Sequence, residues 1–359
     1  MTRVLIMAGG TGGHVFPALA VAEELRSRSV KVEWIGTERG IESRLVPAAA
    51  FKLNLIPIKG LRGNGLLGWL VAPFRILRAV LESRKVIKRF QPDVVIGLGG
   101  FASGPGGLAA WLSGKPLLIH EQNAIAGLTN RLLAKIAKQV LQGFENSFTQ
   151  TTKTKWVGNP VRAQIEKLPE PQVRYAARTL SPFKLLVLGG SLGAKSLNQV
   201  VPQALALLKT EYLIEVIHQC GEKHLADCQQ AYQHAGVTGK VTQFIDDMAV
   251  AYAEADLVIC RAGALTVAEV AATGVAAIFV PYPFAVDDHQ THNAQALKDA
   301  GAALLIQDSS LNAQGLAATL KSLLEDRKQL ENMAIQARAL AKPGTAALIA
   351  DICLEYAHG

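Results

Sequence analysis

Two segments of the chain share one pattern, in which a short apolar run leads into a glycine-rich turn and then into an amphipathic stretch. The first segment has its apolar run at residues 4–8 and its turn at 9–14, and the second has them at 184–188 and 189–194. Because apolar residues then recur at helical spacing, each segment predicts a strand, a glycine loop and a helix. Two such openings in a chain of 359 residues favour two Rossmann-like domains over one enlarged core.

Further short apolar runs predict the other buried strands. They lie at residues 32–35, 94–98, 117–120, 215–218, 257–260 and 276–280, and helical spacing is found between them, as at 132–140 and 264–272. Strand–helix alternation of this kind predicts parallel sheets with right-handed crossovers. The predicted fold class is therefore α/β, with two Rossmann-like domains whose parallel sheets face a central cleft. Ligand residues are expected at the carboxyl ends of the strands.

The domain boundary is predicted where prolines break regular structure. Pro169 and Pro171 follow the segment 158–162, and Lys342-Pro343-Gly344 interrupts the last helices. We therefore expect domains at residues 1–160 and 161–341. Residues 342–359 are expected to contain a separate helix, over 346–357, that returns to the first domain.

The net charge of +8 is distributed unevenly along the chain. Residues 1–160 carry 21 Lys and Arg against 9 Asp and Glu, a net charge of +12, whereas residues 161–359 carry a net charge of −4. This asymmetry indicates that the first half faces an anionic partner, either nucleic acid or an acidic membrane surface.

Other bulk features favour a cytoplasmic protein. The first apolar run is shorter than the core of a secretory signal and leads directly into glycines. The cysteines at 220, 228, 260 and 353 form no CxxC pair, so neither a zinc site nor a disulfide framework is expected.

One segment in the first half combines apolar and basic side chains. It contains Leu66, Leu67, Trp69, Leu70, Phe74, Arg75 and Arg78, and further cations follow at positions 84, 85, 88 and 89. Apolar side chains ringed by cations suit docking onto an anionic leaflet, and the apolar run is too short to span a membrane. The alternative is core packing with a solvated basic helix face.

Both glycine loops could bring backbone N–H groups to phosphate oxygens, although glycine also serves tight turns and close packing. Neither loop is a Walker A motif, because no Gly-Lys-Ser/Thr follows at the required spacing. The first loop also fits a dinucleotide pattern poorly, since Val15 stands where the third glycine belongs. Glu38 follows the second strand and could hold a ribose, so an NAD-type interpretation is weakened but stays open.

Two groups of polar residues follow predicted strands in the first half. His14 follows the first loop, where it could act as a general base toward a sugar hydroxyl or could shape the loop. His120 and Glu121 open a polar run, with Gln122 and Asn123, directly after a buried strand. This run predicts a site, with a hydrogen-bonded loop that covers the strand end as the alternative.

In the second half, Glu269 lies in the first turns of the helix that follows Gly263. A carboxylate there could accept both hydroxyls of a ribose, or could be a solvated residue of an early helical turn. His289 and His292 lie three residues apart without a third ligand pattern, so no metal site is expected.

Taken together, these motifs resemble the MurG family of bacterial N-acetylglucosamine transferases over nearly the whole chain. The resemblance rests on residues 9–14, 97–107, 120–123, 126–130, 158–162, 189–194, 244–248, 261–269 and 289–293. It implies GT-B architecture, with the donor held mainly by the second domain and a lipid acceptor by the first. It also implies that no metal or other cofactor is needed. Phe101 stands where the family often has Tyr, so a role for that hydroxyl does not transfer.

The resemblance also implies a set of donor-binding positions. They are Thr11, Gly12, Gly13, Asn123, Arg162, Ser191, Ile245, Ala264, Leu265, Thr266, Val267, Ala268, Glu269 and Gln290. In this set Glu269 would hold the ribose and Ile245 would present backbone to uracil. Ser191 would meet the diphosphate, and Gln290 would read the sugar.

The implied reaction moves N-acetylglucosamine from UDP-N-acetylglucosamine to the C4 hydroxyl of undecaprenyl-pyrophosphoryl-N-acetylmuramyl-pentapeptide (lipid I), giving lipid II for peptidoglycan. The anomeric centre would be inverted, with His14 as the first candidate base and His120 and Glu121 as further catalytic or orienting groups. The resemblance implies a peripheral protein on the cytoplasmic side of the inner membrane. Its implied partners include cell-wall synthesis and division proteins, and no nucleic acid is expected. A nucleotide-sugar epimerase, a nicotinamide-dependent oxidoreductase and a non-catalytic binding module are the alternatives.

Overall fold

The computed structural model describes residues 1–58, 65–178, 182–190 and 192–359, without the side chains of residues 65–70 and 286. The chain divides into two compact units. Unit 1 comprises Met1–Arg162 and Gly344–Gly359, and unit 2 comprises Ala163–Pro343. The chain therefore returns to unit 1 for its last helix.

Unit 1 is built on a seven-stranded parallel sheet with the order β3-β2-β1-β4-β5-β6-β7. Its strands are β1 (Arg3–Met7), β2 (Lys31–Gly36), β3 (Lys52–Leu55), β4 (Val94–Gly97), β5 (Leu117–Glu121), β6 (Gln139–Gln142) and β7 (Thr154–Trp156). Its helices are α1 (Gly12–Ser27), α2 (Glu42–Ala48), α3 (Gly65–Phe90), α4 (Ser103–Leu112), α5 (Leu128–Leu133) and α15 (Thr345–His358).

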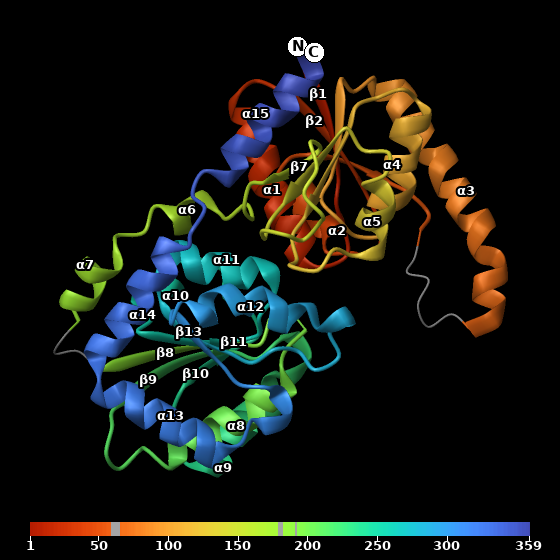
Figure 1. The fold of residues 1–359 in the computed structure, drawn as a ribbon. Coiled ribbons are helices and arrows are strands. Elements are labelled where there is room, and N and C mark those ends of the chain that lie inside the picture. Colours follow the sequence, from red (N-terminus) through yellow and green to blue (C-terminus); the bar gives the residue numbers. More distant parts are fainter. Residues whose placement is uncertain (59–64, 179–181, 191) are drawn as a thin grey trace. The chain divides into compact units, whose positions relative to one another are not determined.

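Helices cover both faces of this sheet (Figure 1). On one face Val4 and Ile6 of β1 pack with α1 and α15, and on the other Leu5 and Met7 pack with α3, α4 and α5. Because both faces are buried, the central strands are continuous apolar runs rather than alternating ones. The two chain ends meet in unit 1, where Thr2 Oγ1 lies 2.9 Å from His358 Nε2.

Unit 2 repeats the design with a six-stranded parallel sheet in the order β10-β9-β8-β11-β12-β13. Its strands are β8 (Phe183–Leu188), β9 (Ile214–Gln219), β10 (Lys240–Thr242), β11 (Leu257–Cys260), β12 (Ala276–Phe279) and β13 (Ala303–Leu305). Its helices are α6 (Ala163–Glu166), α7 (Pro171–Ala176), α8 (Lys195–Ala206), α9 (Leu225–Ala235), α10 (Met248–Glu254), α11 (Ala264–Thr273), α12 (His289–Asp299), α13 (Ala313–Glu325) and α14 (Arg327–Ala339), with short 3-10 turns at Glu222–His224, Val286–Asp288 and Asp308–Ser310.

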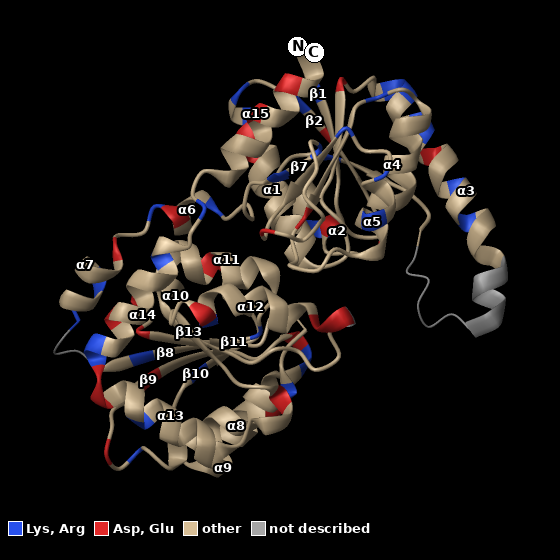
Figure 2. Ribbon diagram, viewed as in Figure 1, with Lys and Arg blue, Asp and Glu red and all other residues tan. Residues whose placement is uncertain are grey.

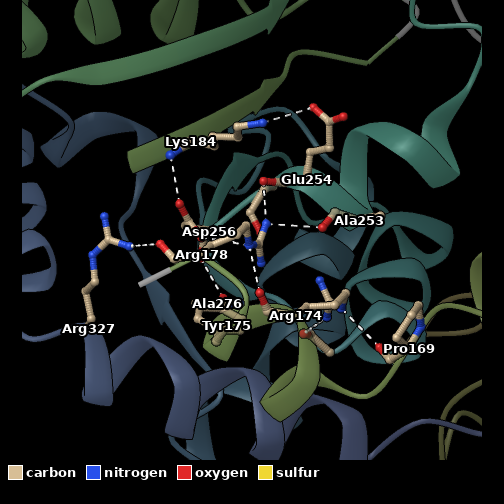
Figure 3. Close-up of polar contacts among 12 residues, drawn as sticks. Pro169, Arg174, Tyr175, Arg178, Lys184, Ala253, Glu254, Asp256, Ala276 and Arg327 are labelled. Carbon is tan, nitrogen blue, oxygen red and sulfur yellow. Dashed lines mark hydrogen bonds and ion pairs between the residues drawn. The ribbon is translucent and has the colours of Figure 1, made fainter. Parts of the chain in front are cut away.

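Arginines fix the segment that enters unit 2 (Figure 3). Arg174 of α7 donates to the carbonyl oxygens of Thr273 and Gly274 at the end of α11, and Arg178 donates to those of Ala253 and Glu254 at the end of α10. Cations at helix C-termini satisfy carbonyl groups that have no partner within the helix. The start of unit 2 is thereby attached to α10 and to α11, and α11 carries candidate donor residues.

Two comparisons with the sequence predictions stand out. The helix predicted at 264–272 is confirmed as α11, and each predicted strand has a counterpart in the two sheets. The helix predicted at 132–140 is wrong, because α5 ends at Leu133 and residues 139–142 form β6. Leu133, Ala137 and Val140 are all buried, so tertiary packing accounts for the apolar spacing that imitated a helix.

Candidate active site

In unit 1 the candidate residues lie at the carboxyl ends of β1, β4 and β5. Between β1 and β4 the strand order reverses, which is where open parallel sheets form ligand crevices. The loop after β1 leads into α1, and the half-buried His14 occupies the first turn of that helix. Its Nδ1 lies 3.4 Å from Thr11 Oγ1.

The glycine loop after β4 lies against His14. Gly99 has a φ of +94°, and a Cβ atom at this position would lie 2.3 Å from Cδ2 of the His14 ring. Gly100 approaches the first loop, since its Cβ would lie 2.0 Å from the carbonyl oxygen of Gly9. Glycine is thus required at both positions by backbone conformation and by space.

His120, at the end of β5, is 0% exposed and engages both ring nitrogens. Nε2 donates to the carbonyl oxygen of Gly158 at 2.9 Å, and Nδ1 accepts from the Gln122 side-chain amide at 3.0 Å. Burial lowers the pKa of His120 from 6.5 to about 4, so the imidazole is neutral near pH 7. The ring is a fixed internal hydrogen-bonding group.

Glu121 organises the loop that follows β5. One carboxylate oxygen accepts from the backbone and side-chain amides of Asn123, and the other accepts from the Gly127 N–H and the Asn130 amide. These four hydrogen bonds fix Asn123 at the strand end. At the end of unit 1, the Arg162 guanidinium lies 5.4 Å from the centre of the Phe16 ring, a stacking distance that positions the cation beside α1.

In unit 2 the second glycine loop follows β8 and packs closely on the turn after β9. A Cβ at Gly193 would lie 2.3 Å from the carbonyl oxygen of Cys220, and one at Gly221 would lie 2.4 Å from the Gly193 nitrogen. Both glycines have positive φ. This contact fixes the loop ahead of α8, although Ser191 itself lies outside the described residues.

Arg261 connects three loops at the same edge of the unit 2 sheet. Its Nη1 donates to Asp308 Oδ1 at 2.5 Å and to the carbonyl oxygens of Val280 and Pro281, and its Nη2 donates to Ser196 Oγ. Ser196 lies in the first turn of α8 and donates to the same Asp308 oxygen. The ion pair is a scaffold that aligns α8 with the loops after β11 and β12.

The start of α11 carries six of the nine donor-binding positions that the resemblance implies in unit 2. Gly263, which has no side chain to cap the helix, precedes Ala264, and Leu265, Thr266 and Ala268 are half-buried on the helix surface. Ala264, Val267 and Glu269 are buried. Glu269 Oε2 accepts from the Tyr252 hydroxyl at 3.1 Å, so its carboxylate is oriented by a neighbouring helix.

Three other positions complete the unit 2 edge. Ile245 is half-buried after β10, and the side-chain oxygen of Gln290 accepts from the Tyr282 N–H at 2.9 Å. Asn293 is buried and donates to the carbonyl oxygen of Ala262 at 3.1 Å, which fixes the loop ahead of α11. The predicted residues of each unit therefore gather at the carboxyl edge of that unit's own sheet.

The surface of α3 bears the predicted apolar and basic side chains. Phe74 is 74% exposed and Leu77 is 56% exposed, with Arg75 and Arg78 exposed beside them. A groove of about 650 Å³ runs along this helix, lined by Leu81, the cations of residues 78, 84, 85 and 88, and Lys115. Figure 2 shows the Lys and Arg residues along α3. Predicted contacts at Leu66, Leu67, Trp69 and Leu70 lie outside the described side chains.

The described residues form neither a membrane-spanning helix nor a metal-binding cluster. Among them, no helix has both the length and the apolar character that crossing a bilayer requires. Nor does this part of the chain bring three or more His, Cys, Asp or Glu side chains together in a way that could hold a metal ion.

Sequence reasoning missed Glu42, a buried residue that organises the first glycine loop. Its side chain is 0% exposed and its carboxylate accepts from the Gly10 N–H in the first loop. By contrast Glu38, the acid considered for a ribose, is exposed. The glycines at 9, 36 and 40 were the available signal, because they surround the Glu42 side chain, but their proximity is visible only in three dimensions.

Comparisons with known proteins agree on one family. Residues 4–142 match the glycosyltransferase family 28 N-terminal domain, and residues 184–349 match the family 28 C-terminal domain. Curated proteins from Cellvibrio japonicus (55% identity) and Nitrosococcus oceani (54% identity) match over 99% of both chains. Each is named UDP-N-acetylglucosamine–N-acetylmuramyl-(pentapeptide) pyrophosphoryl-undecaprenol N-acetylglucosamine transferase.

Solved structures give the same answer for the fold. The crystal structure of MurG from Acinetobacter baumannii is 43% identical, with a TM-score of 0.83 over 99% of this chain and 100% of that one. A UDP-GlcNAc 2-epimerase from Neisseria meningitidis, bound to UDP-GlcNAc, has a TM-score of 0.69 at 13% identity over 99% of this chain and 100% of that one, which shows shared fold alone. The chain has the two-domain GT-B architecture, and it belongs to glycosyltransferase family 28 and, within that family, to the MurG transferases.

Proposed function

We propose that this protein transfers N-acetylglucosamine from UDP-N-acetylglucosamine to the C4 hydroxyl of the lipid-linked muramyl-pentapeptide, lipid I. The names of the relatives, which are 54–55% identical over 99% of both chains, supply the substrates. The structural observation that carries the mechanism is the half-buried imidazole of His14, held between Thr11 and Gly99 at the end of a glycine loop. The two candidate histidines of unit 1 are His14 and His120. His14 is accessible, whereas His120 is fully buried.

The proposed chemistry is a single in-line displacement. His14 takes the proton of the C4 hydroxyl as the hydroxyl oxygen attacks the anomeric carbon, the bond from that carbon to the diphosphate breaks, and UDP leaves. Attack opposite to the leaving group inverts an α-linked donor to a β-linked product. The buried His120 and Glu121 act as positioning groups, because their polar atoms are already committed to the loop after β5.

Unit 2 is proposed to hold most of the donor. Glu269, oriented by Tyr252, accepts the ribose hydroxyls, and the backbone at Ile245 meets uracil. The N-terminus of α11 and the second glycine loop supply N–H groups and helix dipole to the charge that builds on departing UDP. This stabilisation requires no metal ion, so turnover should persist with a chelator present. Thr11, Gly12, Gly13, Asn123 and Arg162 are proposed donor contacts from unit 1, as the family resemblance implies.

The α3 surface is proposed to dock on an anionic leaflet at the cytoplasmic face of the membrane, where the acceptor's pyrophosphate and sugar protrude. Exposed Phe74 and Leu77 would enter the interface, and the cations along the groove would face lipid phosphates. This arrangement places a peripheral enzyme beside its lipid-linked substrate.

The experiment that tests the proposal measures UDP release with and without a short-chain lipid-linked muramyl-pentapeptide. A transferase releases UDP only with the acceptor and leaves the donor sugar unchanged without it. An epimerase would convert the donor at C2 without any acceptor, and a binding module would retain intact donor. Either of these two results would refute the proposed function.

A further inference from the structure

A buried carboxylate lies beneath the first glycine loop, on residues that no candidate site includes. Glu42 opens α2 and is 0% exposed. Its Oε2 accepts from the Gly10 N–H at 2.9 Å, and its Oε1 accepts from the Thr37 N–H at 2.9 Å and the Thr37 hydroxyl at 2.7 Å. Charge-assisted hydrogen bonds of this kind are short and strong, so the carboxylate is a rigid connection between the loop and the end of β2.

The same turn holds Gly10 from both sides. The Ile41 N–H donates to the carbonyl oxygen of Gly10 at 3.4 Å, while Glu42 accepts from its N–H. Gly10 has a φ of +94°, a conformation that L side chains rarely adopt. The conformation of the loop that leads to His14 is therefore set by two consecutive residues, about thirty positions away in sequence.

Three glycines make room for the carboxylate. A Cβ atom would lie 2.4 Å from Glu42 Oε1 at Gly9, 2.7 Å from Glu42 Cγ at Gly36 and 1.9 Å from Glu42 Oε2 at Gly40. Gly9 and Gly40 do not have positive φ, so space rather than backbone conformation requires glycine there. The space left by the first glycine of the loop motif is thus occupied by the Glu42 carboxylate.

We infer that Glu42 is a positioning residue for the transfer reaction, acting through Gly10 to fix the loop that places His14. The inference rests on the proposed function. It also means that the Gly10 N–H is already occupied by a carboxylate and is not a donor to a substrate phosphate. In the loop of unit 2, by contrast, no acidic side chain among the described contacts takes a loop N–H.

The informative substitution is Glu42→Gln, which keeps the shape and removes one acceptor. The Gln oxygen can satisfy the two Thr37 donors, but its amide group would then face the Gly10 N–H, donor against donor. We expect kcat to fall about 10- to 100-fold, since small displacements of a catalytic group have effects of this size. The Kd for UDP, which the proposed function assigns to unit 2, should stay within about twofold.

Thr37→Val is the matched control. It removes the 2.7 Å hydroxyl hydrogen bond to the same carboxylate but leaves the Gly10 contact intact, so it should lower the unfolding temperature and preserve kcat within about twofold. Gly9→Ala is a second test should Glu42→Gln fail to fold, because its Cβ would displace the carboxylate without removing the charge. It should reduce kcat in the same way.

The outcomes separate cleanly. Loss of kcat in Glu42→Gln or Gly9→Ala, with UDP binding and Thr37→Val turnover intact, supports the inference. An unchanged kcat in both Glu42→Gln and Gly9→Ala overturns the inference. A loss of kcat in Thr37→Val as large as the loss in those two variants also overturns it. If the wild-type protein transfers no sugar under these conditions, the proposed function fails first and the inference fails with it.

Discussion

The Tyr252 hydroxyl donates to Oε2 of Glu269 across 3.1 Å, and both side chains are buried in unit 2. Tyr252 lies in α10 and Glu269 in α11, so the bond joins two helices. The hydrogen bond orients the Glu269 carboxylate before any ligand arrives. This reduces the entropic cost of ordering that side chain when ribose binds.

Removing this hydrogen bond should weaken nucleotide binding. We expect Tyr252→Phe to raise the Kd for UDP about 2- to 10-fold, since one hydrogen bond is worth about 0.5–1.5 kcal/mol. Titration calorimetry with UDP measures the change. Tyr175→Phe is the control, because that hydroxyl donates to the backbone of Asp256 instead, at 2.6 Å. Equal effects of the two substitutions would contradict the role assigned to Tyr252.

The contact between Gly99 and His14 gives a second prediction. Gly99→Ala places a methyl group 2.3 Å from the imidazole and should reduce kcat more than tenfold by displacing the ring. Gly114→Ala is matched, because Gly114 also has positive φ (+64°) but its Cβ would meet no described atom within 4 Å. Steady-state rates of both variants decide the matter. A similar loss in Gly114→Ala would attribute the effect to backbone strain.

Burial of His120 predicts acid sensitivity. Its pKa is lowered to about 4 in the folded protein from 6.5, so between these values the unfolded chain binds a proton that the folded protein rejects. The contribution of neutral His120 to the free energy of unfolding is fully present above about pH 6.5. As the pH falls below this value, the free energy of unfolding decreases by up to about 1.4 kcal/mol per pH unit. His218, whose pKa is lowered to about 3 by burial, acts in the same direction.

Urea unfolding at a series of pH values measures this dependence. Between about pH 4 and 6.5, the free energy of unfolding of His120→Asn should depend on pH less steeply than that of wild type, by the slope that corresponds to one proton. A change in stability that is the same at every pH does not affect this slope. An unchanged slope would show that His120 does not titrate between the folded and unfolded states as described.

The α3 surface predicts vesicle binding that depends on exposed apolar side chains. The double variant Phe74→Ser, Leu77→Ser should lower the partition coefficient onto phosphatidylglycerol vesicles at least about tenfold, because burial of each side chain contributes about 1.5–3 kcal/mol. Leu213→Ser, which alters a side chain 75% exposed in unit 2, is the control. Vesicle sedimentation that shows the same loss for both proteins would contradict docking through α3.

Apart from β6, the interior strands of both sheets could be predicted from sequence because both of their faces are buried. Residues 257–260 coincide with β11, and residues 94–98 exceed β4 by one residue. The edge strands β3, β7 and β10 could not, since they contain exposed or polar residues and are only three or four residues long. Hydrophobicity alone does not separate such segments from loops.

The candidate site was predictable where it follows local rules and not where it depends on tertiary contacts. His14, His120 and Glu121 follow strands at positions where ligand residues gather, so their location at the unit 1 sheet edge could be expected. Which of them is accessible could not, because burial of His120 depends on Gly158 and Gln122. Glu42 was out of reach for the same reason, as its partner Gly10 lies in another element.

The most direct test of the central claim follows labelled N-acetylglucosamine from UDP into lipid, with a chelator present. The proposed function predicts that label enters the lipid-linked muramyl-pentapeptide only when that acceptor is supplied, through a β-linkage to the C4 oxygen, with one UDP released for each sugar transferred. Donor that binds to the protein while no label reaches the lipid would contradict it.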